Sequence, residues 1–189
     1  MRLEFEGQTV FVTGAVRGIG RTICHRFAEL GAAVWAADIE EQLLSEITDG
    51  LDDKVMPRIK TVHLDVTNPK NVQDIVAQAQ KASNTGAIDV LIHSAGGVKS
   101  RFKTPIEKVS DADWRAIQAV NVDGAFNLTR AVVPKMKERK KGKIVIISSR
   151  AGLGVSLTGV QSYGTAKAAQ IGLVKQLASE LGQFGITVN

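Results

Sequence analysis

Thr9-Val10-Phe11-Val12-Thr13-Gly14-Ala15-Val16-Arg17-Gly18-Ile19-Gly20 is the stretch that decides the fold. Its first residues are apolar or β-branched, which is typical of a buried parallel strand. Apolar residues at helical spacing follow from Arg21 to Leu30, and Gly31 marks the end of that helix. The glycines therefore fall in a strand-to-helix turn, where main-chain N–H groups at the start of a helix can bind a phosphate.

The next apolar run ends in an acidic residue. Ala32-Ala33-Val34-Trp35-Ala36-Ala37 leads into Asp38, which lies about 20 residues beyond the glycines, where an acid can reach a ribose 2′-hydroxyl. The alternative is that the glycines only make a tight turn and Asp38 caps the next helix. We favour the first interpretation and predict that this part of the chain binds a dinucleotide.

Apolar strands alternate with helical segments along the whole chain. The expected strands lie near 9–13, 33–37, 60–65, 89–93, 143–148 and 186–189. The expected helices cover 19–30, 40–49, 69–83, 111–138 and 160–183. This alternation predicts an α/β fold, with a Rossmann-like, doubly wound parallel sheet and helices on both faces, in three layers α/β/α. No linker or repeat divides the sequence, so we expect a single dinucleotide-binding and catalytic domain over residues 1–189.

Tyr163 and Lys167 lie four residues apart in Ser162-Tyr163-Gly164-Thr165-Ala166-Lys167, so they share one face of the last expected helix. A phenol in water has a pKa of about 10, which is too high for it to exchange protons at neutral pH. A fixed ammonium beside a phenol favours the phenolate, which makes a tyrosine a usable general acid and base. The same spacing also occurs on solvated helices, so the neighbouring motifs have to decide.

Together these motifs resemble those of the short-chain dehydrogenase/reductase family, classical type, over nearly the whole chain. Thr13 to Gly20 matches the glycine-rich turn of that family, and Tyr163 to Lys167 matches its Tyr-x-x-x-Lys motif. Three further matches follow in the expected order: His93-Ser94-Ala95-Gly96, Val120-Asn121-Val122 and Ile146-Ile147-Ser148-Ser149.

The resemblance implies an oxidoreductase that transfers a hydride between NAD(H) and a secondary alcohol or ketone, with Tyr163 as general acid/base. Lys167 would tune Tyr163 and hold the cofactor ribose, and Ser149 would donate a hydrogen bond to the substrate oxygen. Asn121 would position a water that links Lys167 to solvent. Ser148 is the alternative to Ser149, because the loop between Ser149 and Tyr163 is one residue longer than we expect for the family.

The resemblance also implies the cofactor contacts. They are Gly14, Arg17, Gly18, Ile19, Gly20, Asp38, Asp65, Val66, Ala95, Gly96, Tyr163 and Lys167. Asp38 should accept hydrogen bonds from both adenosine-ribose hydroxyls and repel a 2′-phosphate, which favours NAD. Arg17 favours NADP, but Ile39 supplies no second cation, so NAD is preferred and NADP is the alternative. His93 and Ser94 replace a pair of asparagines in the family, so the bracing of the sheet must differ there.

Composition agrees with this interpretation. The 189 residues suffice for one core, and 44% hydrophobic with 23% charged residues is ordinary for a globular protein. The single cysteine, Cys24, excludes an internal disulfide framework and suits a reducing cytoplasm. No stretch resembles a signal peptide or could span a bilayer. The three histidines, His25, His63 and His93, lack metal-ligand spacing, so we expect no metal site.

The net charge of +5 and the pI of 9.4 raise the question of nucleic-acid binding. Much of the excess lies in one short stretch: Lys135, Lys137, Arg139, Lys140, Lys141 and Lys143. Cations are favoured at the end of a helix, and no aromatic residues interleave with them to stack bases. We therefore expect no nucleic-acid partner.

The substrate is the least determined part of the interpretation. We expect its pocket to use the loop from Gly97 to Phe102, which holds Lys99 and Arg101, and the loop after Ser149. Thioesters, sugars or polyols, steroids and cyclic diols all stay open. The alternatives to an NAD-dependent alcohol dehydrogenase are a 3-oxoacyl thioester reductase that uses NADPH and a non-catalytic dinucleotide-binding protein.

The resemblance also concerns the end of the chain and its assembly. Family members continue past the position of Asn189 into a nicotinamide clamp, a lid and a final strand, so we expect the chain to lack that segment. We also expect a homo-oligomer, a dimer or tetramer, packed through the helices over 111–138 and 160–183.

Overall fold

The structure is a computed structural model that describes residues 4–98, 102–157 and 159–189. Within these residues, six parallel strands form one sheet in the order β3-β2-β1-β4-β5-β6. The strands are β1 Thr9–Thr13, β2 Ala33–Asp38, β3 Ile59–His63, β4 Val90–His93, β5 Gly142–Ile146 and β6 Ile186–Val188. The α-helices are α1 Gly18–Glu29, α2 Pro69–Ala82, α3 Asp111–Gln118, α4 Gly124–Arg139 and α5 Gln161–Leu181.

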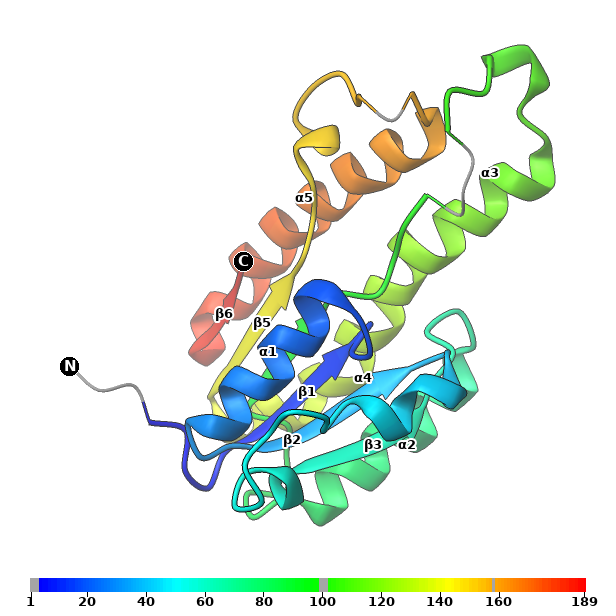
Figure 1. Cartoon of the computed structure of the whole chain (residues 1–189). Helices are drawn as coiled ribbons and strands as arrows, with labels where there is room; N and C mark the ends of the chain where they lie inside the picture. Colours follow the sequence, from blue (N-terminus) through cyan, green and yellow to red (C-terminus); the bar gives the residue numbers. More distant parts are fainter. Residues whose placement is uncertain (1–3, 99–101, 158) are drawn as a thin grey trace.

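The helices cover both faces of the sheet. Side chains of α1 pack with Val10, Val12 and neighbouring strand residues in one buried cluster. Side chains of α2, α4 and α5 pack with Phe11, Leu91 and Ile144 in a second cluster. Because successive strand residues point to opposite faces, β1 feeds both clusters, and it is buried along its whole length. Figure 1 shows α1 on one side of the sheet and α4 on the other. The predicted doubly wound α/β/α fold is confirmed.

The sheet reverses its direction of winding between β1 and β4. The chain builds outward from β1 through β2 to β3, then returns to place β4 on the other side of β1. A reversal of this kind opens a crevice at the carboxyl ends of the strands, where ligands of such sheets bind. The glycine turn after β1, Asp38 at the end of β2 and the segment after β4 all meet at this edge.

Two helical segments differ from the prediction. The helix predicted over 40–49 is wrong, because the chain makes only a short 3₁₀ helix, Glu41–Glu46. Its buried anchors, Leu44 and Ile47, lie three residues apart, which is the repeat of a 3₁₀ turn.

The helix predicted over 111–138 is divided by a π turn, Ala119–Asp123, between α3 and α4. In this turn Gly124 N donates to the carbonyl of Ala119, five residues back. The turn carries Asn121 and therefore bears on the site.

Local signals fix several helix starts. The side chain of Asn68 accepts hydrogen bonds from the N–H groups of Lys70 and Asn71, both at 3.1 Å, with Pro69 at the first position of α2. A cap of this kind is what the Asn-Pro pair predicts. Ser110 caps α3 in the same way through the N–H of Asp113 at 3.1 Å. Figure 1 shows α3 and the first turns of α5 extending past the carboxyl ends of the strands, toward the crevice side.

Candidate active site

The glycine turn brings the main chain of β1 against the segment after β4. Gly14 has φ +67°, and a Cβ there would lie 2.7 Å from the main-chain N of Ala95. A Cβ on Gly20, in the first turn of α1, would collide with the carbonyl of Gly14. Only glycine fits these two approaches, so the turn stays open to a ligand and α1 packs tightly behind it.

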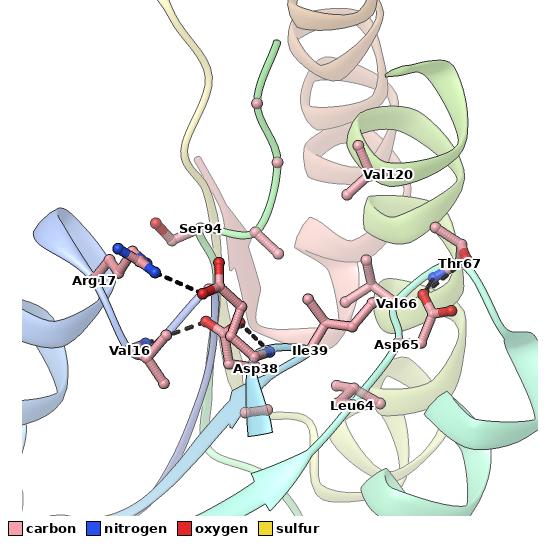
Figure 2. Close-up of a pocket in the computed structure, with 16 residues that line it drawn as sticks. Val16, Arg17, Asp38, Ile39, Leu64, Asp65, Val66, Thr67, Ser94 and Val120 are labelled. Atoms are coloured by element: carbon pink, nitrogen blue, oxygen red, sulfur yellow. Dashed lines mark hydrogen bonds and ion pairs between the residues drawn. The ribbon is translucent and has the colours of Figure 1, made fainter. Parts of the chain in front are cut away.

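A cavity of about 540 Å³ lies at this edge of the sheet. Of the predicted cofactor contacts, it is lined by Gly14, Arg17, Asp38, Asp65, Val66, Ala95 and Gly96. The other predicted contacts, Gly18, Ile19, Gly20, Tyr163 and Lys167, do not line it. Figure 2 shows Arg17 and Asp38 on one side of the cavity and Asp65 and Val66 on the other.

Asp38 is held in place by main-chain groups. Its Oδ2 accepts a hydrogen bond from Val16 N at 3.2 Å, and its Oδ1 accepts one from Glu40 N at 3.1 Å (Figure 2). A carboxylate has about four acceptor positions, so each oxygen keeps capacity for a hydroxyl donor in the cavity. These groups fit the ribose of a dinucleotide.

Arg17 is paired with Glu40, a residue that the sequence reasoning missed. Arg17 Nη2 donates to Glu40 Oε2 at 2.7 Å, and both side chains are largely exposed. Glu40 also lines the cavity, so two carboxylates, at positions 38 and 40, lie near the end of β2. The sequence signal for Glu40 is its position two residues after Asp38, the last residue of the same strand.

Asp65 closes the far side of the cavity. One of its oxygens, Oδ1, accepts hydrogen bonds from Thr67 N at 2.9 Å and Thr67 Oγ1 at 2.7 Å (Figure 2). These bonds fix the turn after β3 and fix the carboxylate with it. Asp65 lines the cavity, and its contact with a bound cofactor stays a prediction.

His93 braces the sheet below the cavity. Its Nδ1 lies 2.9 Å from Thr13 Oγ1, so a side-chain hydrogen bond joins the ends of β4 and β1. Burial, with a smaller contribution from Lys167, lowers the pKa of His93 to about 3, and the imidazole stays neutral. Burial likewise raises the pKa of the Cys24 thiol to about 12, so this thiol stays protonated at neutral pH.

Tyr163 and Lys167 lie together on α5. The Nζ of Lys167 is 5.6 Å from the centroid of the Tyr163 ring. Lys167 is 4% exposed, and its Nζ donates to the carbonyl of Ile147 at 2.9 Å and to Gln170 Oε1 at 3.0 Å. Neither acceptor carries a charge that would offset burial, and burial lowers the pKa of Lys167 to about 8.

Asn121 joins the π turn to the segment after β4. Its Nδ2 donates to the carbonyls of Gly97 at 3.0 Å and Ile117 at 2.9 Å, and its Oδ1 accepts from Gly97 N at 3.2 Å. Its main-chain carbonyl accepts a hydrogen bond from Gln170 Nε2 at 2.6 Å. A side chain, Gln170, therefore connects Lys167 to Asn121 directly, and the water link between the two stays a prediction. Sequence reasoning missed Gln170, although it lies one helical turn after Lys167.

The two adjacent serines have different partners. Ser148 Oγ donates to the carbonyl of Lys167 at 2.9 Å, which commits its proton. Ser149 Oγ accepts from Ala151 N at 3.1 Å, where it caps the short 3₁₀ helix Arg150–Gly152. Because that bond uses a lone pair of the oxygen, the hydroxyl of Ser149 keeps its proton for another acceptor. The hydrogen bonds favour Ser149 over Ser148.

Gly96 lies between the cavity and the side chains of Tyr163 and Lys167 on α5. A Cβ on this residue, which has φ +147°, would collide with Asn121 Oδ1 and lie 3.5 Å from Lys167 Nζ. Gly96 also lines the cavity. The buried ammonium therefore lies directly beyond one end of the cavity, with Tyr163 beside it.

The basic stretch at the end of α4 is paired in part. Three of its cations make ion pairs at 2.7 Å: Lys135–Glu138, Lys137–Glu180 and Arg139–Asp89. Of the helices in the described ranges, none has the length and apolar character needed to cross a bilayer. Those same ranges hold no cluster of three or more His, Cys, Asp or Glu side chains suited to a metal ion. Lys99 and Arg101, which we expected near the substrate, lie outside the described residues.

Comparison with known proteins identifies the family. A family model described as short chain dehydrogenase matches residues 8–189. The chain belongs to the short-chain dehydrogenase family. It is accordingly an NAD(P)-dependent oxidoreductase, and it acts on a small-molecule substrate.

Several relatives support this assignment. The chain is 34% identical over 190 residues to a 3-oxoacyl-[acyl-carrier-protein] reductase, FabG, of Thermotoga maritima, covering 99% of this chain and 73% of the relative. It is 37% identical over 187 residues to the (2S)-[(R)-hydroxy(phenyl)methyl]succinyl-CoA dehydrogenase subunit BbsD of Thauera aromatica, covering 99% and 72%. Among solved structures, that of gox2181 superposes with a TM-score of 0.89 at 30% identity, covering 100% of this chain and 72% of that one.

Proposed function

We propose that this dehydrogenase interconverts a secondary alcohol and a ketone with NAD(H), using Tyr163 as the general acid and base. The observation that carries the proposal is the position of the Lys167 ammonium, buried beside the Tyr163 ring and next to Gly96 at the end of the nucleotide cavity. A cation held there stabilises negative charge that develops nearby during proton transfer. When bound, NAD(H) supplies the acceptor or donor of the hydride.

The residues of the chain have separate roles in this proposal. In oxidation, the Tyr163 phenolate removes the proton of the substrate hydroxyl, and in reduction the phenol returns it. Ser149 donates a hydrogen bond to the substrate oxygen and stabilises the charge that develops there. Asn121 fixes the main chain of Gly97 at the wall of the cavity. Lys167 holds the ribose and tunes Tyr163.

The carboxylates of Asp38 and Glu40 support NAD as the cofactor. Asp38 offers acceptors to ribose hydroxyls, and a 2′-phosphate in the same place would face both negative charges. Arg17 is the one cation among the residues that line the cavity within the described ranges, and its ion pair with Glu40 competes with any phosphate.

Reduction of a 3-oxoacyl thioester with NADPH is the second candidate. The relative from Thermotoga maritima, a 3-oxoacyl-[acyl-carrier-protein] reductase by name, favours it. For such a cofactor Arg17 would have to leave Glu40 and meet the 2′-phosphate. The two candidates therefore differ at one exposed ion pair.

A substrate panel with both cofactors tests the proposal. Secondary alcohols, their ketones and 3-oxoacyl thioesters are assayed with NAD(H) and NADP(H) side by side, by absorbance of the reduced nicotinamide. We expect turnover with NAD(H), and loss of about 100-fold to 10,000-fold in Tyr163→Phe because the general acid/base is removed. Tyr163→Phe should still bind NADH, measured by fluorescence titration. Full activity in Tyr163→Phe would remove this residue from the mechanism, and no turnover of any substrate would favour a non-catalytic dinucleotide-binding protein.

Assembly of the chain into a homo-oligomer through α4 and α5 is part of the proposal. Phe126, on α4, is 47% exposed, and the Arg130 guanidinium lies 4.7 Å from the centroid of its ring. An exposed aromatic ring on this helix suits a contact with a second copy. Light scattering of the purified protein measures the assembly, and a monomer at high concentration would contradict it.

A further inference from the structure

Gln170 is buried between Lys167 and Asn121. It has no part in the catalytic roles assigned above. It is 0% exposed and lies three residues after Lys167 on α5, so the two side chains share one face of the helix. Its Oε1 accepts from Lys167 Nζ at 3.0 Å, and its Nε2 donates to the carbonyl of Asn121 at 2.6 Å. One carboxamide thus touches both the ammonium and the π turn.

The chemistry of the two partners fixes the orientation of this amide. An ammonium only donates hydrogen bonds and a carbonyl only accepts them, so the oxygen must face Lys167 and the nitrogen must face Asn121. The reversed amide would place donor against donor and acceptor against acceptor. A buried amide with both ends satisfied in this way is rigid, because either rotation would leave buried polar groups unpaired.

The bridge continues to the cavity. Asn121 holds Gly97 through two hydrogen bonds, which join its Nδ2 and Oδ1 to the carbonyl and the N–H of Gly97. A hydrogen-bonded path therefore runs from Lys167 through Gln170 and Asn121 to Gly97, at the wall of the cavity. The π turn presents Asn121 to both neighbours at once, with its side chain toward Gly97 and its carbonyl toward Gln170.

We propose that Gln170 is a positioning residue, whose carboxamide links the Lys167 ammonium to the main chain of Asn121 and so fixes the ammonium beside Tyr163 at the end of the cavity. The inference rests on the proposed acid–base role of Tyr163 and Lys167. An amide that donates to a carbonyl does not pass a proton onward, so this bridge sets geometry and charge. Gln170 acts on the reaction only through Lys167.

The charge of Lys167 is the property that reports this role. Its nearest titratable neighbours are Tyr163 on the same helix and His93 at the end of β4, and burial keeps His93 neutral. An acceptor that bonds to the ammonium favours the charged form, and its removal disfavours it. The titration of Lys167 should therefore follow the chemistry of side chain 170.

Titration of Lys167 by NMR in protein labelled at lysine Cε tests the proposal without substrate or cofactor. Gln170→Met keeps the length and burial of the side chain but removes the acceptor, and it should lower the pKa of Lys167 below the native value. Gln170→Glu places a carboxylate against the ammonium and should raise the pKa by about 1 to 3 units. Thermal unfolding of each variant establishes that it is folded.

Gln118→Met is the matched control. Gln118 also joins α3 to α5, because its Nε2 donates to the carbonyl of Ser162 at 2.9 Å, but it is not bonded to Lys167. Its replacement should leave the Lys167 titration at the native value. Shifts of opposite sign in the two Gln170 variants, with none in the control, support the proposal. A Lys167 titration equal to the native one in both Gln170 variants would overturn it, whether or not Tyr163→Phe is inactive.

Discussion

The cavity at the carboxyl edge of the sheet and the group of side chains around Lys167 are built in different ways. Around the cavity, main-chain groups set the geometry: Val16 N and Glu40 N bind Asp38, and Gly14 lets the chain approach Ala95. Around Lys167, side chains reach main-chain carbonyls far away in the sequence, at Ile147 and, through Gln170, at Asn121. The geometry of the cavity therefore depends on main-chain groups and on the positions of glycines. The geometry around Lys167 depends on particular side-chain functional groups.

After Tyr163→Phe, the largest effect should come from the hydroxyl of Ser149. Ser149→Ala removes the proposed donor to the substrate oxygen and should lower kcat by about 100-fold to 1,000-fold. Ser148→Ala is the matched control, because it removes a single hydrogen bond to the carbonyl of Lys167 and should cost less than about tenfold. Steady-state kinetics on the best substrate of the panel measures both. A larger loss in Ser148→Ala would exchange the roles of the two serines.

The second largest effect should come from the close contact between Gly20 and the main chain of Gly14, beside the cavity. Gly20→Ala forces a methyl group into the carbonyl of Gly14 and should destabilise the fold by about 1 to 3 kcal/mol, with weaker NADH binding. Gly172→Ala is the control on α5, since a Cβ there meets nothing within 4 Å. Alanine is the better helix former, so that variant should gain about 0.5 to 1 kcal/mol. Urea unfolding measures both, and equal stabilities would show that the close approach at Gly20 is not needed.

The buried Lys167 should leave a signature in the pH dependence of stability. Its pKa is about 8 in the folded state, against 10.5 for an exposed lysine, so between these pH values the unfolded chain binds a proton that the folded chain has lost. Stability relative to Lys167→Met should therefore rise from pH 8 to pH 10.5, by about 1 to 3 kcal/mol in all.

Urea unfolding of native protein and Lys167→Met across this range measures the difference. Lys175→Met removes an exposed lysine from the same helix and serves as the control. A stability difference between native and Lys167→Met that stays flat with pH would mean that the ammonium is as well solvated as in the unfolded chain.

The smallest effect should come from an exposed side chain of the nucleotide region. Glu40→Gln releases Arg17 and removes one negative charge from the cavity, so the preference for NAD over NADP should fall by about two- to fivefold. Glu41→Gln removes a neighbouring charge that does not line the cavity and should leave the preference unchanged. Dissociation constants of both cofactors give the ratio. An increased preference for NAD in Glu40→Gln would contradict the assigned role of the pair.

The same contrast explains what the sequence could predict. The strands, the glycine turn and the cap at Asn68 follow from local patterns, and the structure reproduces them within a few residues. The π turn was not predicted, because its partners, Gly97 and Gln170, are distant from Asn121 in sequence. Glu40 was missed because its role depends on the side chain of Arg17. The helix predicted over 40–49 failed because two buried anchors three residues apart suit a 3₁₀ turn equally well.

The most direct test of the account is a crystal structure of the protein with NADH bound. The account predicts that the adenosine ribose lies against Asp38 and that the nicotinamide end passes Gly96 to reach the hydroxyl of Tyr163 and the Nζ of Lys167. A bound cofactor with its nicotinamide away from Tyr163 and Lys167 would contradict the account, because the two regions would then not form one catalytic site.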